Sequence, residues 1–136
     1  MALTYLVDTS VYTRLGVEAI ARRVRELDAE GLARPAITDL EIGFSARSAS
    51  EWDRLHEALT AFERVDIEPH HFERAKSVQR LLADRGLRGR KVPDLLIAAV
   101  AESTGRCVLH YDADFDHIAA VTGQPTEWVV PRGSID

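Results

Sequence analysis

Four acidic side chains either follow predicted strands or stand near the start of predicted helices: Asp8, Glu41, Asp94 and Asp112. In a parallel sheet such strand-to-helix junctions lie along one edge, so the four carboxylates are expected to converge. Two carboxylates about 5 Å apart repel by roughly 3 kcal/mol at an effective dielectric constant near 20. Four of them would not stay ionised together without a counterion, which predicts a cation site.

Oxygen ligands with room for water suit Mg²⁺, and Mn²⁺ is expected to support the same chemistry. A divalent cation in such a site can activate water and stabilise charge on a phosphoryl oxygen during an in-line displacement, with one metal or two. The four carboxylates are therefore candidate metal ligands and catalytic residues of a nuclease.

Each of the four acids also has a structural interpretation, as a helix cap, a capping-box partner or a first-turn acid favoured by the helix dipole. The capping-box partner of Glu41 would be Thr38. Caps do not require strand ends to converge, and none explains why Asp94 stands in a segment as apolar as residues 92–101. The set as a whole favours a metal site.

The elements that must position these acids alternate between strands and helices. Apolar runs predict strands over residues 3–7, 34–38, 65–67, 106–110 and 127–130. Helical spacing of apolar residues predicts helices over residues 17–27, 38–48, 52–62, 69–86, 92–101 and 112–121, with Trp52, Phe72 and Leu81 facing inward. Alternating strands and helices imply a three-layer α/β/α sandwich around a central, mostly parallel sheet.

Composition limits the classes of protein to which the chain can belong. Its 136 residues predict one domain over 1–136, and the net charge of −5 argues against nucleic-acid binding through overall positive charge. No apolar stretch approaches the roughly 20 residues of a membrane helix, and the first residues lack signal-peptide features. The single Cys107 excludes an intramolecular disulfide. We expect a cytoplasmic protein with no membrane contact.

A glycine-containing basic loop over residues 87–91 stands just before Asp94. Guanidinium and ammonium groups bind phosphate, so a local basic surface could contact RNA despite the negative net charge. A merely solvated loop is the alternative. The candidate phosphate contacts are Arg85, Arg88, Arg90 and Lys91.

Four blocks of the sequence read LVDTS over residues 6–10, TDLEIG over 38–43, PDLLIAA over 93–99 and LHYDADF over 109–115. Together they resemble the PIN-domain endoribonucleases of the VapC toxin type. The resemblance covers essentially the whole chain, and the first and third blocks are fairly specific in combination. It implies a PIN-domain-like fold in which Asp8, Glu41, Asp94 and Asp112 take the four acidic positions.

The same resemblance implies further features. Ser10 takes a hydroxyl position that supports the acids, with Thr9 beside it, and Asp114 or Asp116 could supplement or replace Asp112. His110 stands where the family often has Thr. The implied biology is a VapB-like antitoxin encoded alongside, a homodimer, and cleavage of structured RNA such as tRNA by water attack at a phosphodiester.

Two other metal signals are weaker. Asp112, Asp114 and Asp116 resemble the start of an EF-hand loop, but the turn glycine and the final Glu of that loop are missing. Cys107 and His110 have a spacing found in zinc sites, although one thiol in a predicted strand is more typical of a buried core. We expect neither site.

Two other function classes stay open. An Asp-dependent phosphoryl-transfer enzyme could use Asp8, but Ser10 stands where a second acid would be expected. A non-catalytic receiver-like signalling domain would need a lysine near the acids after a late strand, and Lys76 and Lys91 are badly placed for that role. A stable aspartyl-phosphate would favour either alternative, whereas metal-dependent RNA cleavage would favour the nuclease.

Overall fold

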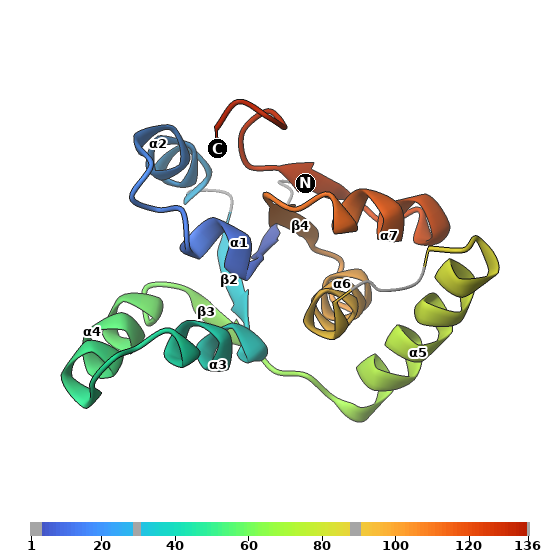
Figure 1. The fold of residues 1–136 in the computed structure, drawn as a ribbon, viewed down its shortest axis with the longest axis horizontal. Helices are drawn as coiled ribbons and strands as arrows, with labels where there is room; N and C mark the ends of the chain where they lie inside the picture. The colour runs from blue at the N-terminus through green and yellow to red at the C-terminus, as the bar shows by residue number, and fades with distance from the viewer. Residues whose placement is uncertain (1–3, 29–30, 88–90, 136) are drawn as a thin grey trace.

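The computed structural model describes residues 4–28, 31–87 and 91–135. Helices separate the successive strands along the chain, two after each of β1, β2 and β3 and one after β4 (Figure 1). The strands are β1 (Tyr5–Val7), β2 (Leu32–Pro35), β3 (Glu63–Val65), β4 (Cys107–His110) and β5 (Thr126–Trp128). The helices are α1 (Thr9–Tyr12), α2 (Glu18–Leu27), α3 (Ala36–Phe44), α4 (Ala49–Leu59), α5 (Pro69–Asp84), α6 (Val92–Ser103) and α7 (Asp114–Thr122).

The strands form one parallel sheet in the order β3-β2-β1-β4-β5. The chain moves outward from β1 to β3 and then returns to the other side of β1 with β4. The carboxyl ends of β1 and β4 therefore flank the point where the strand order reverses, which is where open α/β sheets bind ligands. The order also differs from the 2-1-3-4-5 order of receiver domains, which counts against the receiver-like alternative.

Helices cover both faces of the sheet, as the continuous apolar run of β1 predicted. On one face Leu6 packs in a core with residues of α5, α6 and α7. On the other face Tyr5 and Val7 pack with residues of α1, α2, α3 and α4. The three-layer sandwich with a parallel sheet is thus confirmed. Residue 3, which the predicted first strand included, lies outside the described residues.

The second strand and the helix after it begin earlier than predicted. Pro35 ends β2 and is the N-cap residue of α3, so Thr38 lies inside the helix and cannot form the predicted capping box with Glu41. The Thr38 hydroxyl is buried and lies 3.0 Å from the Thr9 hydroxyl. Proline suits the residue before a helix because it needs no backbone N–H there. Likewise, β3 begins at Glu63 and ends at Val65, two residues before the predicted end.

Three apolar residues predicted to face inward are between 38% and 50% exposed: Trp52, Phe72 and Leu81. On α5 the buried stripe runs through His71, Ala75, Val78 and Leu82. Phe72 and Leu81 lie to either side of this stripe, and His71 takes the inward place. His71 is tolerated there because its Nδ1 accepts a hydrogen bond from the Glu68 backbone N–H at 2.8 Å.

Helix α6 is buried from Asp94 to Ala101 and packs between the sheet and α5 and α7. This burial explains why its sequence is apolar nearly all round, and it fixes the position of Asp94 in the first turn. Within residues 4–28, 31–87 and 91–135, no helix combines the length and apolar character that crossing a bilayer requires.

Candidate functional site

A cavity of about 500 Å³ opens at the carboxyl ends of β1 and β4. Its lining includes all four acids that the sequence singled out, which are Asp8, Glu41, Asp94 and Asp112. Asp8 directly follows β1 and Asp112 stands two residues after β4, and the other two acids come from α3 and α6. The parallel sheet therefore brings together carboxylates that are up to 104 residues apart in the sequence.

Asp8 is both a helix cap and part of the cavity wall. Its Oδ2 accepts hydrogen bonds from the Ser10 backbone N–H at 3.0 Å and from Ser10 Oγ at 2.5 Å. Ser10 Oγ in turn accepts a hydrogen bond from the Tyr111 backbone N–H at 2.9 Å, which ties the end of β1 to the segment after β4. Burial raises the pKa of Asp8 to about 6, against the effect of the Ser10 hydrogen bonds and with help from the charge of Glu41.

Glu41 is held at the cavity by Thr9. The Thr9 hydroxyl donates a hydrogen bond to Glu41 Oε1 at 2.7 Å and lies 3.0 Å from the hydroxyl of Thr38. The two hydroxyl residues after β1 therefore have separate tasks, because Ser10 orients Asp8 while Thr9 orients Glu41.

Asp94 is the least satisfied of the acids. Only 5% of the residue is exposed, and its Oδ2 has no hydrogen-bond partner among the described residues. Burial raises the pKa of Asp94 to about 8, with the charge of Asp8 adding to the rise and Lys91 opposing it. A buried carboxylate oxygen without a hydrogen bond is costly, so it indicates a place for a cation.

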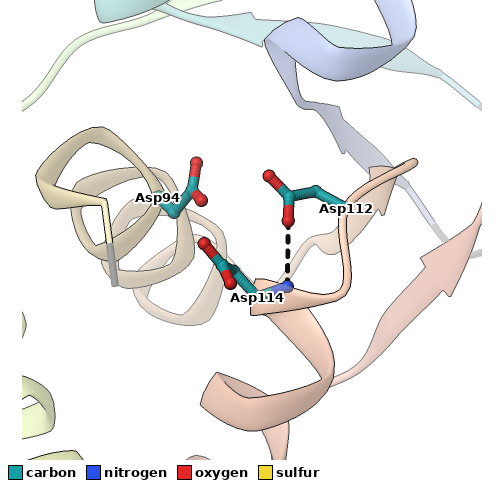
Figure 2. Close-up of side chains that lie close together, drawn as sticks. All are labelled: Asp94, Asp112 and Asp114. Atoms are coloured by element: carbon teal, nitrogen blue, oxygen red, sulfur yellow. Dashed lines mark hydrogen bonds between the residues drawn. The ribbon is translucent and has the colours of Figure 1, made fainter. Parts of the chain in front are cut away.

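Asp112 and Asp114 complete a group of close carboxylates with Asp94 (Figure 2). One oxygen from each of the three lies within 4.8 Å of the others. Asp112 Oδ1 accepts a hydrogen bond from the Asp114 backbone N–H at 2.9 Å, while Oδ2 accepts one from Lys91 Nζ at 2.7 Å. Although burial acts in the opposite direction, these two hydrogen bonds lower the pKa of Asp112.

These residues fit a divalent cation, because hard oxygen donors meet beside a carboxylate oxygen that lacks a partner. Asp94, Asp112 and Asp114 form the close group, of which Asp94 and Asp112 line the cavity. Asp8 and Glu41 also line the cavity but do not belong to the close group. Asp114 thus joins Asp112 in the structure and does not replace it.

Asp116 lies elsewhere. Its carboxylate accepts a hydrogen bond from Trp128 Nε1 at 3.1 Å and lies 3.8 Å from Arg132 Nη1. Like Asp114, Asp116 is not part of the cavity lining, but unlike Asp114 it is also outside the group of close carboxylates. Asp114 and Asp116 leave the first turn of α7 in different directions, so the structure brings only one of the two alternative acids to the site.

His110 stands at the position where the resemblance would place a Thr. The side chain is fully buried, and its Nδ1 accepts a hydrogen bond from the Asp112 backbone N–H at 3.2 Å. Burial lowers the pKa of His110 to about 4, so the ring is neutral at physiological pH. His110 therefore orients the backbone that carries Asp112.

Of the predicted basic cluster, the structure describes Arg85 and Lys91. Arg88 and Arg90 lie outside the described residues, and Arg85 is exposed at the end of α5, away from the cavity lining. Lys91 lines the cavity from the start of α6, not from a position after a late strand, which is where a receiver-like domain would need its lysine. As the N-cap residue of α6 it faces the segment after β4, a proximity that the sequence does not indicate.

Sequence reasoning missed Arg14, which also lines the cavity. Its Nη1 donates a hydrogen bond to the Ser10 carbonyl at 2.9 Å, and its guanidinium lies 5.2 Å from the centre of the Tyr111 ring. The short helix α1 ends at Tyr12, and the turn that follows brings Arg14 back towards the cavity. No motif marks this turn, so only the separation of α1 from α2 could have indicated it.

Comparison with known proteins gives a consistent result. The sequence model of the PIN domain family matches residues 5–121. Ribonuclease VapC51 of Mycobacterium tuberculosis is 58% identical over 137 residues, with 100% of both chains covered. The similarity to a curated relative is therefore not confined to the acidic motifs.

Solved structures share the fold. The crystal structure of VapBC2 from Rickettsia felis bound to a promoter DNA fragment matches with a TM-score of 0.77 at 17% identity, covering 92% of this chain and 98% of that one. VapBC-5 of Mycobacterium tuberculosis, a member of the VapBC family of toxin-antitoxin systems, matches with a TM-score of 0.63 at 25% identity, covering 91% and 95%. With its acidic cavity at the β1/β4 switch point, the chain belongs to the PIN domain family and is of the VapC type.

Proposed function

We propose that the protein is a metal-dependent endoribonuclease, the toxin of a type II toxin-antitoxin system, which cleaves structured RNA, with tRNA as the first substrate to test. The observation that carries this proposal is the convergence of Asp8, Glu41, Asp94 and Asp112 around one cavity in which Asp94 Oδ2 is buried without a hydrogen bond among the described residues. The ribonuclease name of the 58% identical relative supports the activity.

In the proposed reaction the close carboxylates have a different role from Asp8 and Glu41. Asp94, Asp112 and Asp114 would hold Mg²⁺ or Mn²⁺. When bound, the cation supplies a Lewis acid that favours ionisation of water and neutralises charge on the phosphate. Asp8 and Glu41, fixed by Ser10 and Thr9, are placed to orient an attacking water and to accept its proton.

Incubation of the purified protein with total tRNA tests the activity directly. We expect cleavage in Mg²⁺ or Mn²⁺ and none in EDTA, and mapping the fragment ends identifies the bond. Cleavage that persists at full rate in EDTA would overturn the metal mechanism. A stable phosphoprotein formed from a small phosphodonor, with no RNA cleavage, would instead favour the phosphoryl-transfer alternative.

The basic residues before α6 give a prediction on RNA binding. Replacing Arg85, Arg88 and Arg90 together with Gln should weaken binding and flatten its salt dependence, by about 0.7 in the log–log slope for each phosphate that is no longer neutralised. Titrations of RNA at several salt concentrations measure this slope. An unchanged slope would mean that the loop is only solvated.

A partner protein is the other part of the proposal. On α3, Leu40 is 76% exposed and Phe44 is 92% exposed, although Glu41 between them faces the cavity. Large apolar side chains so exposed mark an interaction site. We assign this surface to a VapB-like antitoxin, whose basic tail would reach the carboxylates with an Arg, because a guanidinium pairs bidentately with them.

Co-expression with the neighbouring antitoxin gene should yield a complex from the wild-type chain. Leu40→Ser with Phe44→Ser should lose most of the complex while keeping the fold, because neither side chain is buried. The matched control is Phe72→Ser, a half-exposed apolar residue on α5. Equal recovery of the complex from all three chains would contradict this assignment.

Light scattering of the free toxin tests the predicted homodimer. We also propose that the protein acts in the cytoplasm, where its RNA substrate is found.

A further inference from the structure

Lys91 supplies a positive charge from the chain itself to the carboxylates of the site. Its Nζ lies 2.7 Å from Asp112 Oδ2 and 3.9 Å from Asp94 Oδ2. These are two of the three acids whose oxygen atoms approach one another closely. We propose that Lys91 is an internal counterion of the metal-free site and that a divalent cation must displace it to bind. The inference rests on the proposed metal site and adds that Lys91 competes with the cation for it.

The hydrogen bonds of Asp112 explain why the two cations compete. Its Oδ1 accepts a hydrogen bond from the Asp114 backbone N–H, which is fixed by the first turn of α7, so we infer that a metal uses Oδ2, whose hydrogen-bond partner is a flexible side chain. Lys91 Nζ occupies that same atom. Since Mg²⁺ binds oxygen at about 2.1 Å, an ammonium still hydrogen-bonded to the same atom would lie within about 5 Å of it. Two positive charges at that distance repel strongly in a partly buried site.

The side chain of Lys91 can move away from Asp112 at little cost. It is 62% exposed, whereas the side chains of Asp94 and Asp112 are mostly buried. The flexible lysine stem can therefore swing into solvent without disturbing the core, while the acids stay in place. In the metal-free state the pair relieves repulsion among the acids. Once released, the ammonium remains at the cavity mouth, where an RNA phosphate would arrive.

Metal affinity gives the first test, by calorimetric titration with Mn²⁺. Lys91→Met should bind Mn²⁺ about tenfold more tightly than the parent, because a competitor worth about 1.4 kcal/mol has been removed. Lys76→Met is the matched control, since Lys76 is 72% exposed on α5 and pairs only with Glu73 within 4 Å among the described residues; its affinity should equal the parent's. Unchanged or weaker binding by Lys91→Met would overturn the inference. Failure of the parent to bind any divalent cation would overturn the metal site itself.

Thermal melts separate competition from a purely structural role of Lys91. If Lys91 is displaced on metal binding, it stabilises only the metal-free protein. Lys91→Met should then melt at a lower temperature than the parent in EDTA and at the same temperature in saturating Mn²⁺. An equal loss under both conditions would mean that Lys91 stabilises the fold regardless of metal, which contradicts displacement.

Displacement can also be observed directly, because Lys76 and Lys91 are the two lysines of the chain. In protein labelled with ¹³C-lysine, the side-chain Cε signal of Lys91 should move towards the value of a free lysine as Mg²⁺ is added. The Lys76 signal should stay in place and serves as the internal control. A Lys91 signal that is unmoved at saturating Mg²⁺ would show that metal and ammonium bind together, and the inference would fail.

Discussion

Asp94→Asn is expected to reduce RNA cleavage by about a thousandfold or more while leaving the fold intact, because removing a ligand charge forfeits several kcal/mol of transition-state stabilisation. Asp94 is buried in the first turn of α6, and its Oδ2 has no hydrogen bond in the described part of the chain, so an amide of the same shape breaks none there. Single-turnover cleavage of tRNA in Mg²⁺ measures the loss.

Asp8→Asn should have a similar effect on activity. This substitution removes the negative charge of the side chain but keeps its ability to cap α1. Asn is as good an N-cap as Asp, so the hydrogen bond from the Ser10 backbone N–H can persist. Asp116→Asn is the matched control, because that acid contacts Trp128 outside the cavity, and it should cleave at the parental rate. Both active-site variants should also relieve the growth arrest caused by the toxin. Near-parental cleavage by a folded Asp8→Asn or Asp94→Asn protein would remove the mechanism.

The second large effect concerns stability, because we expect the acids that we propose for catalysis to oppose folding when no metal is bound. Mg²⁺ or Mn²⁺ should raise the melting temperature by several degrees, since binding to the folded state contributes about 2.7 kcal/mol at a hundredfold excess over Kd. In EDTA, Asp94→Asn should be at least as stable as the parent and should gain less from added metal. A first-turn acid that served only the helix dipole would give the opposite sign, a loss in the variant of about 0.3–1 kcal/mol regardless of metal.

The pH dependence of the metal-free protein follows from the same group. Folding raises the pKa of Asp94 to about 8, from about 3.9 in an unfolded chain. The folded state therefore binds more protons between these values, and the share of stability that Asp94 controls is lost as pH rises from about 4 to about 8. Melts in EDTA across this range should show a smaller decline for Asp94→Asn than for the parent. An identical decline in both proteins would mean that Asp94 ionises as it would in water.

The sequence by itself determined the parts of this protein that depend on local patterns. Apolar runs and helical spacing marked the strands and helices, and their alternation implied the parallel sheet. A parallel sheet places the carboxyl ends of all its strands at one edge. The convergence of Asp8, Glu41, Asp94 and Asp112 could therefore be expected from the order of the elements alone. The boundaries were harder to predict because residues such as Thr38 satisfy more than one local rule.

Only the tertiary structure decided which side chains meet at the site. Asp114 and Asp116 are equivalent as sequence, but the rotation of α7 turns the first towards Asp94 and the second towards Trp128. Lys91 reaches Asp112 across 21 residues because α6 packs against the segment after β4. Such contacts depend on how buried elements pack against one another. Spacing along the chain fixes the direction of a side chain within its own element, whereas its partner on another element is set by the packing of the two.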